Sequence, residues 1–189
     1  MRFTENLRKL KKFFYFTQNF TNLENQLITA YVGLGSNLGD RAGNLLLAVR
    51  GFLEAGFYVN KLSAIYETEP NGVKGHEKYL NLCAEIRVTS VSPSQMMARI
   101  MRIEYLLGRR DKNLKKPRII DLDLLLYGNF QCHTELLTLP HPRMHERKFV
   151  LVPLNELAPH LLHPVQNKTI QELLKVTRDD LEVKRWNPN

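Results

Sequence analysis

Two aspartates alternate with leucines in residues 119–127, and no other segment restricts the folding of this chain as strongly. In an extended strand, residues two positions apart point to the same side. Asp121 and Asp123 therefore project together from one face. The opposite face is apolar and consists of Ile120, Leu122, Leu124 and Leu126. This pattern predicts a sheet with a packed core on one side and two neighbouring carboxylates on the other.

The residues alone leave two interpretations of the aspartate pair open. Neighbouring carboxylates in partly desolvated surroundings repel each other and are driven toward protonation unless a cation or a donor compensates. Mg²⁺ suits this position because it takes one or two protein carboxylates together with substrate phosphates, and a carboxylate pair can seat two metal ions. Alternatively, the pair lies at a strand end and forms salt bridges with Arg118 or other basic residues.

Basic residues flank the aspartates in the sequence. Those upstream are Arg109, Arg110, Lys112, Lys115, Lys116 and Arg118, and those downstream are His141, Arg143, His145, Arg147 and Lys148. Arginine forks pair with phosphate oxygens and stabilise charge on a leaving phosphate. A charge run is usually a solvated loop, so these residues favour a polyphosphate ligand only in combination with the aspartates.

A second pair of polar residues, Tyr79 and Asn81, shares a strand face by the same alternation. A flat aromatic surface beside an amide suits a planar heterocycle, although either residue can equally serve the core or a backbone group. The glycines in residues 33–39 resemble a dinucleotide-binding loop, but the third comes one residue late for GxGxxG. We expect them to allow a tight turn and the close approach of a ligand or backbone.

Strands are expected at residues 28–34, 57–66 and 80–89, the last half-buried because its apolar residues alternate. A helix after Asp40 should bury the stripe Leu45, Ala48, Val49, Phe52 and Leu53. Capping boxes at Ser92 and Thr169 predict two further helix starts, and residues 149–157 are apolar enough to pack on the core.

This order of elements predicts an α+β domain of ferredoxin-like type, a largely antiparallel sheet with helices packed on it. We expect that domain to span residues 29–177. Residues 1–28 form a basic, variable extension, and residues 178–189 form a charged, frayed tail.

Composition excludes several classes of protein. The 189 residues, 43% apolar and 24% charged, are typical of one globular domain, and no apolar run approaches the roughly 18 residues of a membrane span. Two distant cysteines indicate neither a disulfide framework nor a zinc site, so a reducing cytoplasm is expected. The net charge of +8 favours polyanions without choosing among nucleic acid, membrane surface and nucleotide.

Five short segments carry a resemblance to a known family. They are residues 31–41, 79–81, 117–123, 140–141 and 147–149. In this order and spacing they resemble the 6-hydroxymethyl-7,8-dihydropterin pyrophosphokinases of folate biosynthesis, and the Pro-Arg-x-Ile-Asp-Leu-Asp segment is the most specific of them. The resemblance covers about residues 29–165. It implies a ferredoxin-like, usually monomeric enzyme that binds MgATP and then the pterin, yielding AMP and the pterin pyrophosphate.

The resemblance also implies residue roles. Asp121 and Asp123 would hold two magnesium ions, and Asp121 would belong to the substrate site. Tyr79 and Phe149 would sandwich the pterin, while its ring edge would be read by Asn81 and the backbone around Thr68. The ATP site would consist of Glu104, Arg109, Arg118, Leu124, His141 and Arg147. Arg109 and Arg118 would act in catalysis with the two aspartates.

Several positions depart from the family pattern. Lys115 and Lys116 stand where Arg, Trp and Gly are frequent, with one residue fewer, and Asp111 replaces a frequent arginine. Met101 replaces a glutamine and Pro142 a tyrosine. We expect secondary ATP contacts and loop closure to differ here.

Two other functions are open, a nucleic-acid-binding α+β domain and an inactive homologue. Two acids at the centre of a basic surface would repel phosphate without a metal, and the match at the four catalytic positions disfavours an inactive protein. We therefore predict an enzyme with ATP as co-substrate and Mg²⁺ as cofactor, monomeric, with no nucleic-acid or membrane partner.

Overall fold

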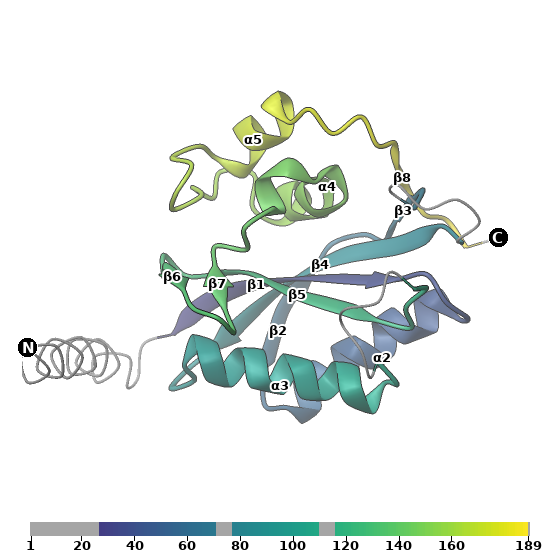
Figure 1. Ribbon diagram of the computed structural model, residues 1–189, viewed down its shortest axis with the longest axis horizontal. Coiled ribbons are helices and arrows are strands. Elements are labelled where there is room, and N and C mark those ends of the chain that lie inside the picture. The colour runs from purple at the N-terminus through teal and green to yellow at the C-terminus, as the bar shows by residue number, and fades with distance from the viewer. Residues whose placement is uncertain (1–26, 71–76, 110–115, 189) are drawn as a thin grey trace, which may run out of the picture.

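The computed structural model describes residues 27–70, 77–109 and 116–188, and a central sheet divides these into layers. The strands are β1 (Ile28–Ser36), β2 (Tyr58–Leu62), β3 (Tyr66–Thr68), β4 (Tyr79–Val88), β5 (Asp121–Tyr127), β6 (Cys132–His133), β7 (Thr138–Leu139) and β8 (Val183–Arg185). The helices are α2 (Arg41–Glu54), α3 (Pro93–Leu106), the 3₁₀ turn η1 (Met144–Glu146), α4 (Lys148–Leu157) and α5 (Ile170–Val176). Helices α2 and α3 cover one face of the sheet, and α4 and α5 lie over the other (Figure 1).

The large sheet has the strand order β5-β1-β4-β3-β8, and β2 also pairs with β4. All of these neighbouring strands are antiparallel. The predicted α+β architecture, a largely antiparallel sheet with helices packed on it, is confirmed. The ferredoxin-like label stays a prediction. Strand β8 and helices α4 and α5 are additional to the βαββαβ order of a ferredoxin-like fold.

Helices α2 and α3 begin where the sequence indicates. The Ser92 hydroxyl accepts from the Gln95 amide at 3.2 Å, and the Ser92 amide donates to the Gln95 side chain at 2.8 Å, which completes the predicted capping box. In α2 the predicted stripe is buried at Leu45, Ala48 and Phe52. Leu53 was wrongly assigned to it, because one step beyond Phe52 turns the side chain about 100° around the helix, into solvent.

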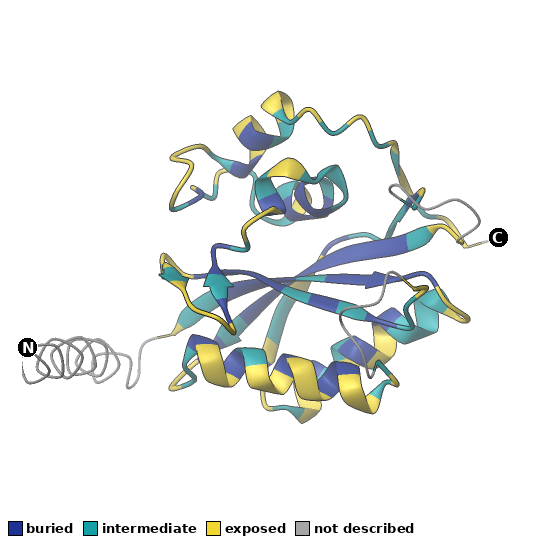
Figure 2. Cartoon of the chain, viewed as in Figure 1, coloured by how far each residue is buried: buried dark blue, intermediate teal, exposed yellow. Residues whose placement is uncertain are grey.

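Strand β4 is buried on both faces rather than half-buried as predicted. Its apolar residues face α2 and α3, while Cys83 packs in a second cluster with Tyr31 and Leu151 beneath α4. The dark blue of β4 in Figure 2 reflects this double covering. Sequence alternation could not reveal the second layer, because α4 comes from residues far along the chain.

The strand predicted at residues 57–66 is two strands. β2 and β3 both pair with β4, and residues 63–65 separate them. At the interruption the Ser63 amide donates to the Cys83 carbonyl at 3.0 Å, and the Ser63 hydroxyl accepts from the Cys83 amide at 2.9 Å. One side-chain bond thus stands in for one backbone bond between the strands.

A β-bulge shifts the side chains of β5. Leu124 pairs with Val32 and Leu126 with Tyr31, which leaves Leu125 as an extra residue. Leu122 and Leu124 therefore join the core under α2 and α3, as predicted, but Leu126 packs in the cluster under α4. The assignment of Leu126 to the first face was wrong for this reason.

Part of the predicted frayed tail forms a strand, contrary to the prediction. Val183–Arg185 form β8 and pair with β3 at the edge of the sheet. The second capping box is confirmed, because the Thr169 hydroxyl accepts from the Glu172 amide at 3.2 Å at the start of α5. The predicted N-terminal extension, apart from residues 27 and 28, lies outside the described residues. Within the described ranges, no helix has the length and apolarity needed to cross a bilayer.

Gly51 sets how closely α2 approaches α3, and a substitution there tests this packing. A Cβ at Gly51 would lie 2.8 Å from Cγ2 of Ile103, and this atom has little freedom to move because a β-branched residue in a helix strongly prefers one χ1 rotamer. We expect Gly51→Ala to lower the free energy of unfolding by about 1–2 kcal/mol, although alanine favours helix by about 1 kcal/mol. Urea denaturation measures this.

Ile103→Ala provides the control for that prediction. In the Ile103→Ala background the clash is gone, so adding Gly51→Ala should become neutral or stabilising. Equal destabilisation by Gly51→Ala in both backgrounds would contradict the contact.

Candidate active site

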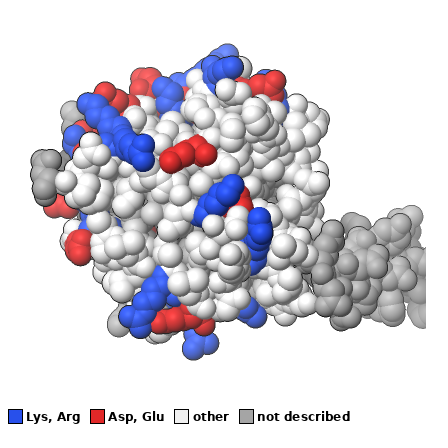
Figure 3. Space-filling model, turned by 180° about the vertical axis from the view of Figure 1, so that it is seen from behind, with Lys and Arg blue, Asp and Glu red and all other residues white. Residues whose placement is uncertain are grey.

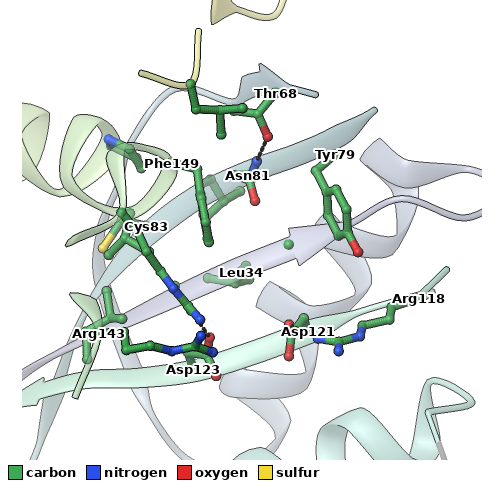
Figure 4. Close-up of a pocket in the computed structure, with 18 of the residues that line it drawn as sticks. Leu34, Thr68, Tyr79, Asn81, Cys83, Arg118, Asp121, Asp123, Arg143 and Phe149 are labelled. Carbon is green, nitrogen blue, oxygen red and sulfur yellow. Dashed lines mark hydrogen bonds and ion pairs between the residues drawn. The ribbon is translucent and has the colours of Figure 1, made fainter. Parts of the chain in front are cut away.

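A cleft of 500 Å³ opens at the end of the sheet that α4 leaves uncovered. Residues on β1, β4 and β5 form its floor, and residues at the beginning of α4 form a wall. The lining includes Gly33, Leu34, Gly35, Thr68, Tyr79, Asn81, Lys116, Arg118, Asp121, Asp123, Arg143, Arg147, Phe149 and Leu181. Figure 4 shows several of these side chains directed into the space above the strands.

Glycines of β1 make room for the functional residues on the neighbouring strands. Gly35 lies between Asn81 on β4 and Asp121 on β5, and Gly33 lies between Cys83 and Asp123. A Cβ at Gly35 would stand 3.1 Å from the Asn81 side-chain oxygen. The predicted close approach is thus found, although both glycines lie within a strand and not in a turn.

Asp121 is held by two arginines. One carboxylate oxygen accepts a hydrogen bond from Arg109, and the other accepts from Arg118 at 2.6 Å. Burial acts to raise the pKa of Asp121, but the two guanidinium groups outweigh it and hold this pKa below its ordinary value. The carboxyl is therefore ionised, and the salt-bridge interpretation left open by the sequence applies to Asp121.

Glu104 lies behind the cleft and does not line it. Its carboxylate, 1% exposed, accepts the Leu122 amide at 2.9 Å and also pairs with Arg109. Burial alone would lower the pKa of Arg109, but Asp121 and Glu104 raise it. Glu104 therefore fixes Arg109 and β5 together, and a direct contact with ATP stays a prediction.

The second aspartate faces the cleft beside residues that precede α4. Arg147 lies 3.9 Å from the Asp123 carboxylate, and Arg143 also lines the cleft. The His141 amide donates to the Leu125 carbonyl at 2.9 Å, and the His141 side chain lines a neighbouring cavity. Burial lowers the pKa of His141, and Arg147 adds to this while Asp123 opposes it.

An aromatic pair borders the other half of the cleft. Tyr79 and Phe149 lie on either side of Asn81 in Figure 4. The Asn81 amide donates to the Thr68 hydroxyl at 2.9 Å, which leaves its oxygen toward Gly35. These four predicted substrate residues are thus brought together, with a hydrogen-bonding edge between two flat rings.

The donor set fits Mg²⁺ better than a transition metal. Asp121 and Asp123 line the cleft with 23% and 34% of their side chains exposed. In the described ranges no cluster of three or more His, Cys, Asp or Glu residues could hold a metal ion. Mg²⁺ needs few protein carboxylates when phosphates and water complete its shell. Each Asp121 oxygen accepts one bond from an arginine, which leaves a lone pair on each oxygen for a metal ion.

The sequence predictions missed some residues of the site. Asn37 is buried, and its side chain accepts the Arg118 amide at 2.6 Å, which ties the Arg118 segment to the end of β1. Leu181 lines the cleft from the C-terminal residues assigned to the tail. Leu124, in contrast, lies in the core under α2 and α3 and does not line the cleft. Asp111 and Lys115 lie outside the described residues.

One face of the molecule bears on the nucleic-acid alternative. On the face seen in Figure 3, the described lysines and arginines lie singly or beside acidic side chains, rather than in one continuous basic surface. A polyanion track requires such a surface.

Comparison with known proteins agrees with these features. A family model described as 7,8-dihydro-6-hydroxymethylpterin-pyrophosphokinase matches residues 31–159. The 2-amino-4-hydroxy-6-hydroxymethyldihydropteridine pyrophosphokinase of Aquifex aeolicus is 36% identical over 146 residues, covering 77% of this chain and 90% of the relative. The Bacillus subtilis enzyme of the same name is 44% identical over 129 residues, covering 68% and 77%.

A solved structure shares the fold. A Plasmodium falciparum HPPK-DHPS variant superposes with a TM-score of 0.63 at 19% identity, covering 80% of this chain. This chain spans 46% of the length of that protein.

Asp121 should contribute stability that depends on pH. Because its pKa is lowered in the folded protein, the contribution is fully present above the unfolded value of about 3.9 and is lost as pH falls through the folded pKa. We expect Asp121→Asn to lower the free energy of unfolding at pH 7. The difference in this free energy between the variant and the unmodified protein should become smaller below about pH 4. Urea denaturation from pH 7 to pH 3 measures both. A difference in unfolding free energy that stays constant down to pH 3 would contradict the proposed ion pairs.

Proposed function

The chain belongs to the 7,8-dihydro-6-hydroxymethylpterin-pyrophosphokinase family, and we propose that it transfers pyrophosphate from ATP to 6-hydroxymethyl-7,8-dihydropterin in folate biosynthesis. The products are AMP and the pterin diphosphate. One observation carries the proposal: a carboxylate pair with arginines and an aromatic pair with an amide line the same cleft.

The two halves of the cleft suit the two substrates. The pterin ring would lie between Tyr79 and Phe149, with its polar edge at Asn81 and Thr68. The triphosphate of ATP would lie at the other half, which Arg118 lines and behind which Arg109 is buried. The Nε atoms of both arginines have no hydrogen-bond partner among the described residues. The other predicted contacts on this side are Glu104, Leu124, His141 and Arg147.

Magnesium fits this arrangement as a cofactor held by Asp121 and Asp123. When bound, two ions would neutralise charge on the β- and γ-phosphates. Since both oxygens of Asp121 engage arginines in the structure, Arg109 and Arg118 would move from Asp121 to phosphate oxygens as the substrate enters.

Transfer follows from these positions. The hydroxymethyl oxygen of the pterin attacks the β-phosphorus and forms an O–P bond. The bond from the β-phosphorus to the oxygen bridging the α-phosphate breaks, and AMP leaves with that oxygen. Asp121 orients the hydroxymethyl group, whose proton leaves to solvent, and the arginines stabilise charge on the departing phosphate. The monomeric state and the cytoplasmic location stay predictions.

The reaction is tested by its nucleotide product. We expect the purified protein to convert ATP to AMP only when hydroxymethyl-dihydropterin and Mg²⁺ are both present, because pyrophosphoryl transfer cleaves between the α- and β-phosphates. Separation of nucleotides by ion-exchange chromatography measures AMP and ADP. Formation of ADP in place of AMP would overturn the proposal, and no nucleotide product with both additions would favour the inactive-homologue alternative.

The carboxylates should be required for turnover. We expect Asp121→Ala and Asp123→Ala each to lower kcat by about 100-fold or more, because metal binding and charge stabilisation contribute several kcal/mol to the barrier. Glu54→Gln is the control, since Glu54 is an exposed carboxylate of α2 that pairs with Arg50. Circular dichroism verifies folding. Near-normal turnover in either aspartate variant would exclude its metal role.

A further inference from the structure

The residues that follow α5 run along the substrate side of the molecule. Residues 177–186, which we call the C-terminal segment, pass the beginning of α4 and end beside β3 as β8, as the yellow trace in Figure 1 shows. They lie beyond residues 31–159, which the family model matches. Their contacts reach α4 and β3, two of the three elements that carry the pterin-binding residues proposed above.

The first contact is at the N-terminus of α4. The Lys148 amide donates to a carboxylate oxygen of Asp179 at 2.7 Å, and the Leu181 amide donates to the other oxygen at 3.0 Å. The residue at the cap position, Arg147, makes no side-chain capping bond. Asp179 thus supplies from a distant segment the acceptor that the first turn of a helix needs.

Lys148 lies between two residues of the cleft. Arg147 pairs with Asp123 at 3.9 Å, and its guanidinium carbon is 5.5 Å from the centre of the Phe149 ring. Both side chains line the cleft. The bond from Asp179 to the intervening amide therefore fixes the backbone from which both side chains project.

The second contact is with β3. Val183 pairs with Thr68, and the Trp186 amide donates to the Ile65 carbonyl at 2.9 Å. Thr68 in turn accepts the bond from Asn81. Between the two contacts, Leu181 lines the cleft itself.

We propose that Asp179 is a positioning residue for the pterin subsite, because the C-terminal segment spans from the Phe149 backbone to the Thr68 strand and sets the distance between them. This inference rests on the proposed function. A capping carboxylate at a helix N-terminus also benefits from the helix dipole, so the contact is stronger than a neutral bond. The segment acts on substrate affinity and not on the reacting atoms.

The test compares Asp179→Ala with Asp180→Ala. Asp180 is the next residue, is exposed, and loses the same charge on substitution. Asp179→Ala should raise the KM for hydroxymethyl-dihydropterin roughly fivefold to tenfold, the loss expected for a helix cap, and leave kcat within about twofold. Asp180→Ala should leave both unchanged, and Asp179→Asn, which keeps one acceptor oxygen, should be intermediate.

Two direct measurements separate positioning from a general loss of structure. Hydrogen exchange of the Lys148 amide should accelerate in Asp179→Ala while amides in β1 and β4 keep their protection. Fluorescence titration with 6-hydroxymethylpterin in the presence of α,β-methylene-ATP should show the same weakening without turnover. The inference would be overturned if the two alanine variants had the same KM and the same affinity for 6-hydroxymethylpterin, or if Asp179→Ala lowered kcat alone. Should the unmodified protein form no AMP, the proposed function fails instead, whereas the exchange experiment still tests the contact.

Discussion

Charge compensation around Asp121 is the interaction on which the rest of the site depends. A carboxylate next to the apolar core is unfavourable unless it is paired, and Arg109 and Arg118 provide the pairing from outside the strand. Glu104 extends the network to α3 and to the Leu122 amide. One set of ionic contacts therefore joins a helix, a strand and the segment preceding it, and leaves arginine donors at the edge of the cleft.

The cleft exists because the sheet is covered unevenly. Helix α4 packs on the part of the sheet around Tyr31 and Cys83, and the other end stays open above Gly35. At that end β1 has glycines, which have no side chains, while the neighbouring residues of β4 and β5 project side chains above the sheet. The substrate space thus results from the lack of side chains on β1 as much as from the residues that line it.

Local patterns predicted local features well. Alternation placed Asp121 and Asp123 on one face, and capping residues located the starts of α3 and α5. Features that depend on distant segments were missed for a physical reason. The second layer over β4, the ordered β8 and the role of Leu181 arise from contacts between residues about 100 positions apart, and no local period encodes them. The sequence also could not decide whether arginines or metal compensate Asp121, since both need the same surrounding residues.

The bulge at Leu125 divides β5 into two halves with independent side-chain phases. Upstream, the phase aligns the acids with the glycines of β1; downstream, it turns Leu126 toward the helices above the sheet. Because the bulge separates the two registers, a change in side-chain packing beneath α4 need not alter the direction of the two carboxylates. The half of the strand that carries the acids and the half that packs beneath α4 therefore have separately set side-chain directions, although they are covalently continuous.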